Sequence, residues 1–329
     1  MEVDLPDSLE AVRIHLVPQI RERFTWELMK LNARLEGNEE FEGPPFQTIA
    51  GDLSVEVVFD MPRSTRTITR ENLDAWGTDF DSVLEIARQN LREASAPNFK
   101  RISPGVYVSQ WRDTFDAARM STTDVLFDLE VKGHHVVFIP HRDEMVVTGT
   151  LEEAGLSSPA QYVAKSLQAP RPITGRAYRL GGVEWFPYLP ESEHPAFNAL
   201  KELAMNNLAG CYSEQQNYLE KLSEKRGEDI YVGSQILAKD PSGTPQSISV
   251  WTKGIVTLLA EADFVYFVDP DKKESKVAGE VRWERALEVL SAKMEPQGLF
   301  PERYRVTDFP TEEELSTLTL TPSSKPSVQ

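Results

Sequence analysis

Hydrophobic residues recur along the chain at two different spacings, which predicts a protein that contains both strands and helices. Residues 53–60, LSVEVVFD, form a nearly continuous apolar run that is typical of a strand buried on both faces. Residues 80–91 carry apolar side chains at helical spacing and follow Thr78 and Asp79, either of which is a suitable N-cap. Residues 195–225 keep the helical spacing for much longer. We therefore expect an α+β fold, with mixed or antiparallel sheets flanked by helices.

The distribution of these elements divides the chain into four parts. Between residues 8 and 35 the apolar positions have helical spacing, and Pro18 is expected to kink or split that helix. The two central parts mix strand and helix patterns, and the end of the chain is rich in Ser, Thr and Pro. We expect an N-terminal helical segment over residues 1–47 and a first α+β domain over residues 48–190. A second α+β domain over residues 191–315 and a disordered tail over residues 316–329 should follow.

The two predicted α+β domains share a faint order of motifs. In each, a helix leads into a short strand with a central tyrosine, VYV at 106–108 and IYV at 230–232. Each domain later has an apolar strand that ends in an acidic turn, at 138–143 and 267–271. A diverged duplication into two similar α/β halves would give this order, and so would chance, because helix-then-strand order is common in α+β proteins. Both explanations stay open.

Composition and charge narrow the class of partner. The chain has 329 residues, 40% of them hydrophobic and 26% charged, which is ordinary for a soluble globular protein. Its formal net charge is −17. That charge repels the phosphate backbone of nucleic acids, so we expect no nucleic-acid partner. The same acidity suits docking onto the basic surface of another protein, which is the partner we expect.

Several sequence features argue against a metal or nucleotide cofactor and against a secreted or membrane-bound location. Cys211 is the single cysteine, so neither an intrachain disulfide nor a zinc site built from several cysteines is available. The acidic N-terminus lacks the apolar core of a signal peptide, and no apolar run approaches the roughly 18 residues of a membrane span. Glycine-rich nucleotide motifs, HExxH and GxSxG are absent. We therefore expect a cytoplasmic protein with no membrane segment, no cofactor and no metal.

The segment HHVVFIPHRDEMVVTG, residues 134–149, holds three of the five histidines. Its pattern predicts two strands joined by a turn. A straight strand would separate His135 and His141 by about 20 Å, and His134 would point away from His135. The three cannot then share a metal ion, whose ligands lie about 2 Å from a common centre. A metal site formed by His141, Asp143 and a distant carboxylate is a weaker alternative.

The polar turn at the end of the first strand is a candidate site. His141, Arg142, Asp143 and Glu144 lie together there, where side chains converge on the end of a sheet. A solvated turn, with Asp143 accepting a turn hydrogen bond, is the simpler interpretation.

The segment DTFDAARM, residues 113–120, is the second candidate. Asp116 and Arg119 are three residues apart, close enough to pair on a helix. If this pair packs against the His141 turn, the two segments form one polar pocket. Alternatively the pair is a brace that fixes a loop beneath the edge of the sheet.

Residues 48–190 resemble a bacterial family of uncharacterised proteins, the YtpQ-like family, which is a domain of unknown function. The likeness rests on LSVEVVFD, LEIARQNL, FDAARM, VVFIPHRDEMVVTG and RPITGRAYRL, which occur in this order. The resemblance places Asp116, Arg119, His141, Asp143 and Arg171 at the characteristic positions of the family. It implies a fold and a location for the site, but no reaction.

Two functions are consistent with these observations. The first, which we favour, is a non-enzymatic protein-binding or regulatory protein, such as an immunity-like protein that neutralises a toxin, acting through an acidic surface. The second is a hydrolase-like enzyme in which His141 is the general base, Asp143 or Asp116 orients it, and Arg119 or Arg142 steadies an anionic substrate. Arg142 and Arg171 are the expected binding residues. The enzyme requires His141 and Asp116 to reach one shared pocket.

Overall fold

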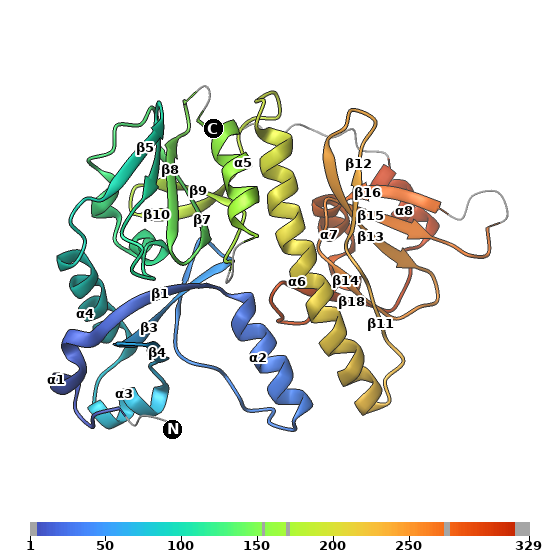
Figure 1. The fold of residues 1–329 in the computed structure, drawn as a ribbon. Helices are drawn as coiled ribbons and strands as arrows, with labels where there is room; N and C mark the ends of the chain where they lie inside the picture. Colours follow the sequence, from blue (N-terminus) through green and yellow to red (C-terminus); the bar gives the residue numbers. More distant parts are fainter. Residues whose placement is uncertain (1–4, 153–154, 169–171, 273–276, 320–329) are drawn as a thin grey trace. The chain divides into compact units, whose positions relative to one another are not determined.

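The chain folds into two compact units, which the computed structural model describes over residues 5–152, 155–168, 172–272 and 277–319 (Figure 1). Unit 1 comprises Met1–Trp26 and Glu42–Ala204, and unit 2 comprises Glu27–Phe41 and Met205–Gln329. Antiparallel and mixed sheets with flanking helices make up the two units, so the predicted α+β class is confirmed. Within the described residues, no helix combines the length and the apolarity needed to cross a membrane.

Unit 1 begins with a four-stranded antiparallel sheet that is centred on β3. The apolar run predicted as a buried strand forms β3, and its first six residues are buried. Strands β1, β2 and β4 pair with it. The bounds are β1 Leu16–Glu22, β2 Gln47–Ile49, β3 Leu53–Met61 and β4 Ser64–Thr67, with helices α1 Leu9–Val12, α3 Arg70–Trp76 and α4 Phe80–Glu93.

Helix α4 forms as its sequence predicts. The Asp79 carboxylate caps it by accepting a hydrogen bond from the Ser82 amide, at 2.8 Å. Its apolar stripe is buried against β1 and β3 at Val83, Leu84 and Ala87. Each such side chain contributes about 1–3 kcal/mol through burial, which fixes the helix on the sheet.

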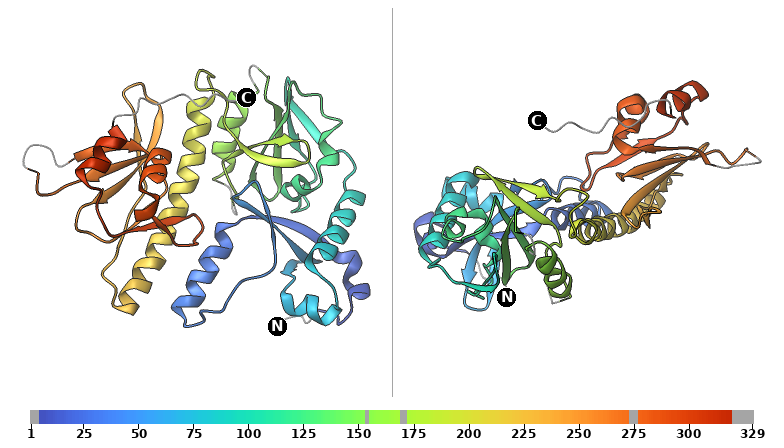
Figure 2. Two further views of the ribbon diagram at one scale, coloured as in Figure 1. Left: turned by 180° about the vertical axis from the view of Figure 1, so that it is seen from behind. Right: turned by 90° about the horizontal axis from the view of Figure 1, so that it is seen from above.

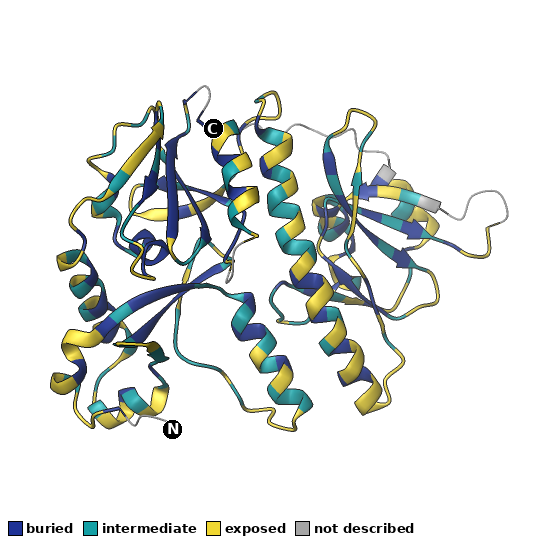
Figure 3. Cartoon of the chain, in the orientation of Figure 1, coloured by how far each residue is buried: buried dark blue, intermediate teal, exposed yellow. Residues whose placement is uncertain are grey.

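A six-stranded antiparallel sheet completes unit 1, in the order β10-β9-β7-β8-β6-β5. The central hairpin β7–β8 is the predicted strand pair, and it is buried on both faces (Figure 3). Val137 and Ile139 pack into one core with β1, β3 and α4, whereas Val136 and Phe138 pack against α5 and the start of α6. The bounds are β5 Phe99–Ser103, β6 Val106–Ser109, β7 His135–His141, β8 Glu144–Gly149, α5 Ser157–Ser166, β9 Ala177–Gly181 and β10 Glu184–Tyr188.

The prediction of a helix over residues 8–35 is wrong for residues 13–22. Between α1 and helix α2, Phe24–Leu35, the chain forms a 3-10 turn and then strand β1. The apolar residues that suggested a helix are four apart, and a spacing of four also fits the two-residue period of a strand. Pro18 sits in β1, an edge strand of its sheet, where the missing N–H is tolerated.

The sequence STTDVLFDLEVKG, residues 121–133, begins with candidate helix caps and ends with a glycine, which predicts a helix that the structure does not form. Two short 3-10 helices, Ala117–Ser121 and Thr123–Leu126, take its place. Neither has a side-chain cap, and Thr122 between them lies outside helical geometry. The chain therefore turns sharply here and enters β7 through residues 127–134.

Unit 2 contains two four-stranded sheets with one parallel pair each, β11 with β14 and β13 with β15. Helices α7 and α8 lie together beside β15 and β16 (Figure 2). Leu31 of α2 packs against Leu219 and Leu222 of α6. The bounds are α6 Phe197–Arg226, β11 Tyr231–Val232, β12 Ile236–Lys239, β13 Pro245–Thr252, β14 Thr257–Ala260, β15 Phe264–Val268, β16 Val277–Arg282, α7 Trp283–Leu290, β17 Glu295–Pro296, β18 Arg303–Val306 and α8 Glu312–Thr319.

The two strands that suggested a duplication differ in their pairing. Strand β6 is antiparallel to both β5 and β8, whereas β11 is parallel to β14. The similar order of residues is therefore not accompanied by a similar strand arrangement at these positions.

A buried arginine connects several elements of unit 2. The Arg303 guanidinium donates to the Gln215 side chain at 2.5 Å, and to the carbonyls of Gly233 at 2.6 Å and Tyr212 at 3.0 Å. A further bond reaches the Leu258 carbonyl at 3.1 Å. All of these partners are neutral, and burial lowers the pKa of Arg303 to about 10. One side chain thus joins β18, β14, α6 and the chain after β11.

Candidate functional site

The structure brings the two candidate segments together through their backbones. The Ala117 amide donates to the Arg142 carbonyl at 3.0 Å, which fixes the 113–119 segment to the β7–β8 turn. The sequence did not predict that these two segments meet. It indicated only that they would form one polar pocket if they did. The side chains, however, make different contacts from those expected.

Arg119 pairs with Asp113 and not with Asp116, so the expected Asp116–Arg119 pair is wrong. The guanidinium is fully buried and makes two parallel bonds to the Asp113 carboxylate, at 2.9 and 2.7 Å. It also donates to the Ser95 hydroxyl at 2.7 Å and stacks 4.1 Å from the centre of the Trp111 ring. Arg119 therefore acts as a brace between the loop and the end of α4.

Asp116 is fully buried beside this brace. Neither of its carboxylate oxygens makes a hydrogen bond of ordinary geometry within the described residues. Burial raises the pKa of Asp116, and the Ser109 hydroxyl and Arg119 only partly oppose that rise. An acid with a raised pKa is a candidate proton carrier, but no described contact joins Asp116 to His141.

His141 has contacts at both ring nitrogens. Nδ1 accepts a hydrogen bond from the Asp143 amide at 3.2 Å, and Nε2 lies 3.6 Å from a Glu144 carboxylate oxygen. Glu144 in turn accepts from the hydroxyls of Tyr162 and Ser166 on α5. Burial, together with Glu144, raises the pKa of Tyr162 to about 12. The Asp143 side chain stays exposed at the turn, so the expected orienting carboxylate is replaced by Glu144.

Tyr162 and Ser166 were not predicted as site residues. Their spacing of four on a helix puts them on one face, which is the only sequence signal that relates them. Burial raises the pKa of Glu56, and Arg21 opposes that rise together with a smaller contribution from the charge of Arg142. Arg171 lies outside the described residues. The hydrolase therefore stays a hypothesis, with no described contact between its base and Asp116.

The loop that carries Asp113 has an unusual backbone. Arg112 and Thr114 have φ values of 53° and 70°, in the left-handed region that disfavours residues with a Cβ. These two residues turn the chain so that Asp113 faces Arg119.

Replacing Thr114 with glycine should therefore relieve strain. We expect Thr114→Gly to be more stable than Thr114→Ala by about 1 kcal/mol, although glycine normally costs stability. Urea denaturation of both variants measures the difference. A Thr114→Ala protein that equals or exceeds Thr114→Gly in stability would show that the left-handed conformation carries no strain.

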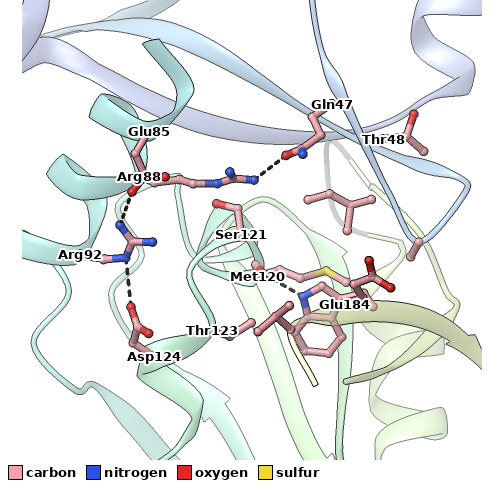
Figure 4. A pocket seen from close by; sticks show the side chains of 14 residues that line it. Gln47, Thr48, Glu85, Arg88, Arg92, Met120, Ser121, Thr123, Asp124 and Glu184 are labelled. Atoms are coloured by element: carbon pink, nitrogen blue, oxygen red, sulfur yellow. Dashed lines mark hydrogen bonds and ion pairs between the residues drawn. The ribbon is translucent and has the colours of Figure 1, made fainter. Parts of the chain in front are cut away.

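Unit 1 also contains a cavity of about 570 Å³, which we call the Arg88 cavity (Figure 4). Its walls come from β2, α4, the two 3-10 helices and β10. Arg92 donates to Glu85 at 2.8 Å and to Asp124 at 3.0 Å, whereas Arg88 donates to the neutral amide oxygen of Gln47 at 2.6 Å. Two neighbouring arginines are thus neutralised to different degrees.

Unit 2 has its own cavity of about 470 Å³, which we call the acidic groove. Three glutamates and a small set of apolar or aromatic side chains form it. The lining residues are Glu261, Trp283, Glu284, Leu287, Glu288, Ser291 and Tyr304.

The comparisons with known proteins give no family. No family model matches the sequence, and neither the curated proteins nor the solved structures yield a match. The YtpQ-like resemblance therefore stays a prediction. Among the described residues, no group of three or more His, Cys, Asp or Glu side chains is arranged to hold a metal ion. The fold and the site therefore define an α+β protein that contains the buried Arg119 brace, the Arg88 cavity and the acidic groove.

Proposed function

We propose that the chain is a non-enzymatic regulatory protein that binds a basic segment of a partner protein through the acidic groove of unit 2. One observation carries the proposal: the groove combines an apolar, aromatic floor with a rim of glutamates. A lysine or arginine side chain has the complementary form, with an apolar stem and a cationic head.

The floor of the groove suits the stem. Trp283 and Tyr304 lie edge to face with ring centres 5.4 Å apart, and Leu287 is half-buried beside them. Trp283 is anchored in the core of unit 2, so the floor is already formed before any ligand arrives. A preformed apolar surface lowers the entropic cost of binding.

The rim suits the cationic head. Glu284 and Glu288 are one turn apart on α7 and both are exposed, and Glu261 follows β14. Arg285 neutralises part of this charge through a 2.8 Å bond to Glu288. Burial, followed by the charges of Glu261 and Glu302, raises the pKa of Tyr304, as expected where the potential is negative.

The charge of the whole chain supports the same partner. A net charge of −17 attracts basic molecules over distances of about a Debye length and speeds their encounter with the groove. Binding of this type weakens as salt is added, which distinguishes it from purely apolar docking.

A labelled peptide of alternating arginine and glycine tests the proposal. We expect saturable binding by fluorescence anisotropy at low salt, and at least about tenfold weaker binding at 0.3 M salt. The matched peptide with glutamate in place of arginine should not bind. Failure of the basic peptide to bind at low salt, or equal binding of the acidic one, would contradict the proposal.

A further inference from the structure

Unlike its neighbour Arg92, Arg88 makes no hydrogen bond to a carboxylate within the described part of the chain. Arg92 is held between Glu85 and Asp124, whereas the one hydrogen bond described for Arg88 goes to Gln47. Its Nε atom is buried and has no partner within the described residues. A guanidinium carries five N–H donors, so most of the hydrogen-bonding capacity of Arg88 is unused by the described contacts.

This incomplete neutralisation has a physical cost. Burial lowers the pKa of Arg88, and the charge of Arg92 lowers it further, while Glu85 opposes the change. Half-buried cations in proteins are normally paired, because desolvation of an unpaired charge is unfavourable. An anion placed beside Arg88 would remove that cost.

The lining of the cavity offers further donors. Figure 4 shows Arg88 reaching from α4 toward Gln47, and Ser121 lines the same cavity while its hydroxyl donates to the Ala118 carbonyl at 2.7 Å. The hydroxyls of Thr48 and Thr123 also line the cavity, and Trp185 contributes to its floor. A volume of about 570 Å³ matches the cavities that hold small organic molecules, which commonly lie between about 300 and 1,000 Å³.

We propose that the Arg88 cavity binds a small organic molecule through a carboxylate or phosphate group placed on the Arg88 guanidinium. The group takes the unused N–H donors of Arg88, and the rest of the molecule lies toward Trp185. Glu184 lines the same cavity, so a molecule with one anionic end and an uncharged or cationic body fits better than one with two anionic ends. This site is independent of the acidic groove.

Isothermal titration with phenyl phosphate, benzoate and inorganic phosphate tests the site and separates the two anion chemistries. We expect one of the two aromatic anions to bind more tightly than inorganic phosphate, because only the aromatic anions have a body for the remaining volume. Arg88→Met should weaken that binding at least about tenfold, the usual scale for a charge-assisted bidentate contact. Arg63→Met, which removes the same charge from an exposed turn, should leave it unchanged.

Gln47→Glu gives a second test that does not depend on removing Arg88. The new carboxylate would pair with the guanidinium at the position of the Gln47 amide oxygen, which should raise the melting temperature and abolish anion binding together. Unchanged binding in both Arg88→Met and Gln47→Glu would overturn the proposal, as would equal loss of binding in Arg63→Met. Absence of binding by all three anions to the unmodified chain would overturn it as well.

Discussion

Replacing Arg303 with methionine should lower the free energy of unfolding of unit 2 by about 3–5 kcal/mol. The substitution removes every hydrogen bond that this fully buried side chain donates, so the Gly233 and Tyr212 carbonyls and the Gln215 side-chain oxygen each lose the bond from Arg303. Methionine can fill much of the space but donates no hydrogen bond. Hydrogen exchange should therefore accelerate in residues 212–233 and 257–260, and not in β7 and β8 of unit 1.

Arg305 provides the matched control. It lies two residues further along β18, and its side chain is exposed. Arg305→Met removes the same charge, and we expect a change within about 0.5 kcal/mol, as is usual for surface positions. If Arg303→Met were no more destabilising than Arg305→Met, the neutral hydrogen bonds of Arg303 would contribute little to the fold.

Arg119→Met should lower the stability of unit 1 by about 2–4 kcal/mol. The lower end of this range reflects the 39% exposure of the Asp113 side chain, which lets water solvate the carboxylate that remains. Arg112→Met removes a neighbouring exposed charge and should have little effect. Urea denaturation compares the two variants, and equal destabilisation would refute the role of Arg119 as a brace.

The same brace predicts a pH dependence. Burial works against ionisation of Asp113, but the bonds and charge of Arg119 outweigh it and lower the pKa of Asp113. A carboxyl whose pKa is lowered by folding stabilises the folded state above its unfolded pKa, about 3.9, and loses that contribution as the pH falls through the folded value. The stability difference between the wild type and Asp113→Asn should therefore shrink as the pH falls below about 4. A difference that is constant from pH 6 to pH 2 would contradict this assignment.

The parts of the fold that could be predicted are those with an unambiguous period. The hairpin β7–β8 and the helices α4 and α6 have hydrophobic patterns that fit one type of element only. Strand β1 could not be distinguished from a helix, because residues four apart share a face in both. The partner strand β3 decides the outcome by pairing with β1 over its whole length.

The site was harder to predict, because side-chain partners depend on loop geometry. The i,i+3 spacing favoured Asp116 as the partner of Arg119, but the left-handed conformations of Arg112 and Thr114 present Asp113 instead. The Arg88 cavity is assembled from distant segments, including Gln47, Ser121 and Glu184, whose proximity no sequence pattern indicates. The acidic composition was the only sequence feature that indicated a basic protein partner, which is the partner proposed for the acidic groove.

The proposed recognition of a basic segment is tested most directly by comparing two double variants with the same charge change. Glu284→Gln with Glu288→Gln removes two charges from the acidic groove, and Glu312→Gln with Glu313→Gln removes two exposed charges from α8. Anisotropy titrations with the arginine–glycine peptide at low salt should show binding at least about tenfold weaker for the groove variant and nearly unchanged for the α8 variant. Equal weakening in both would mean that the peptide responds to overall charge, and the groove would not be the binding site.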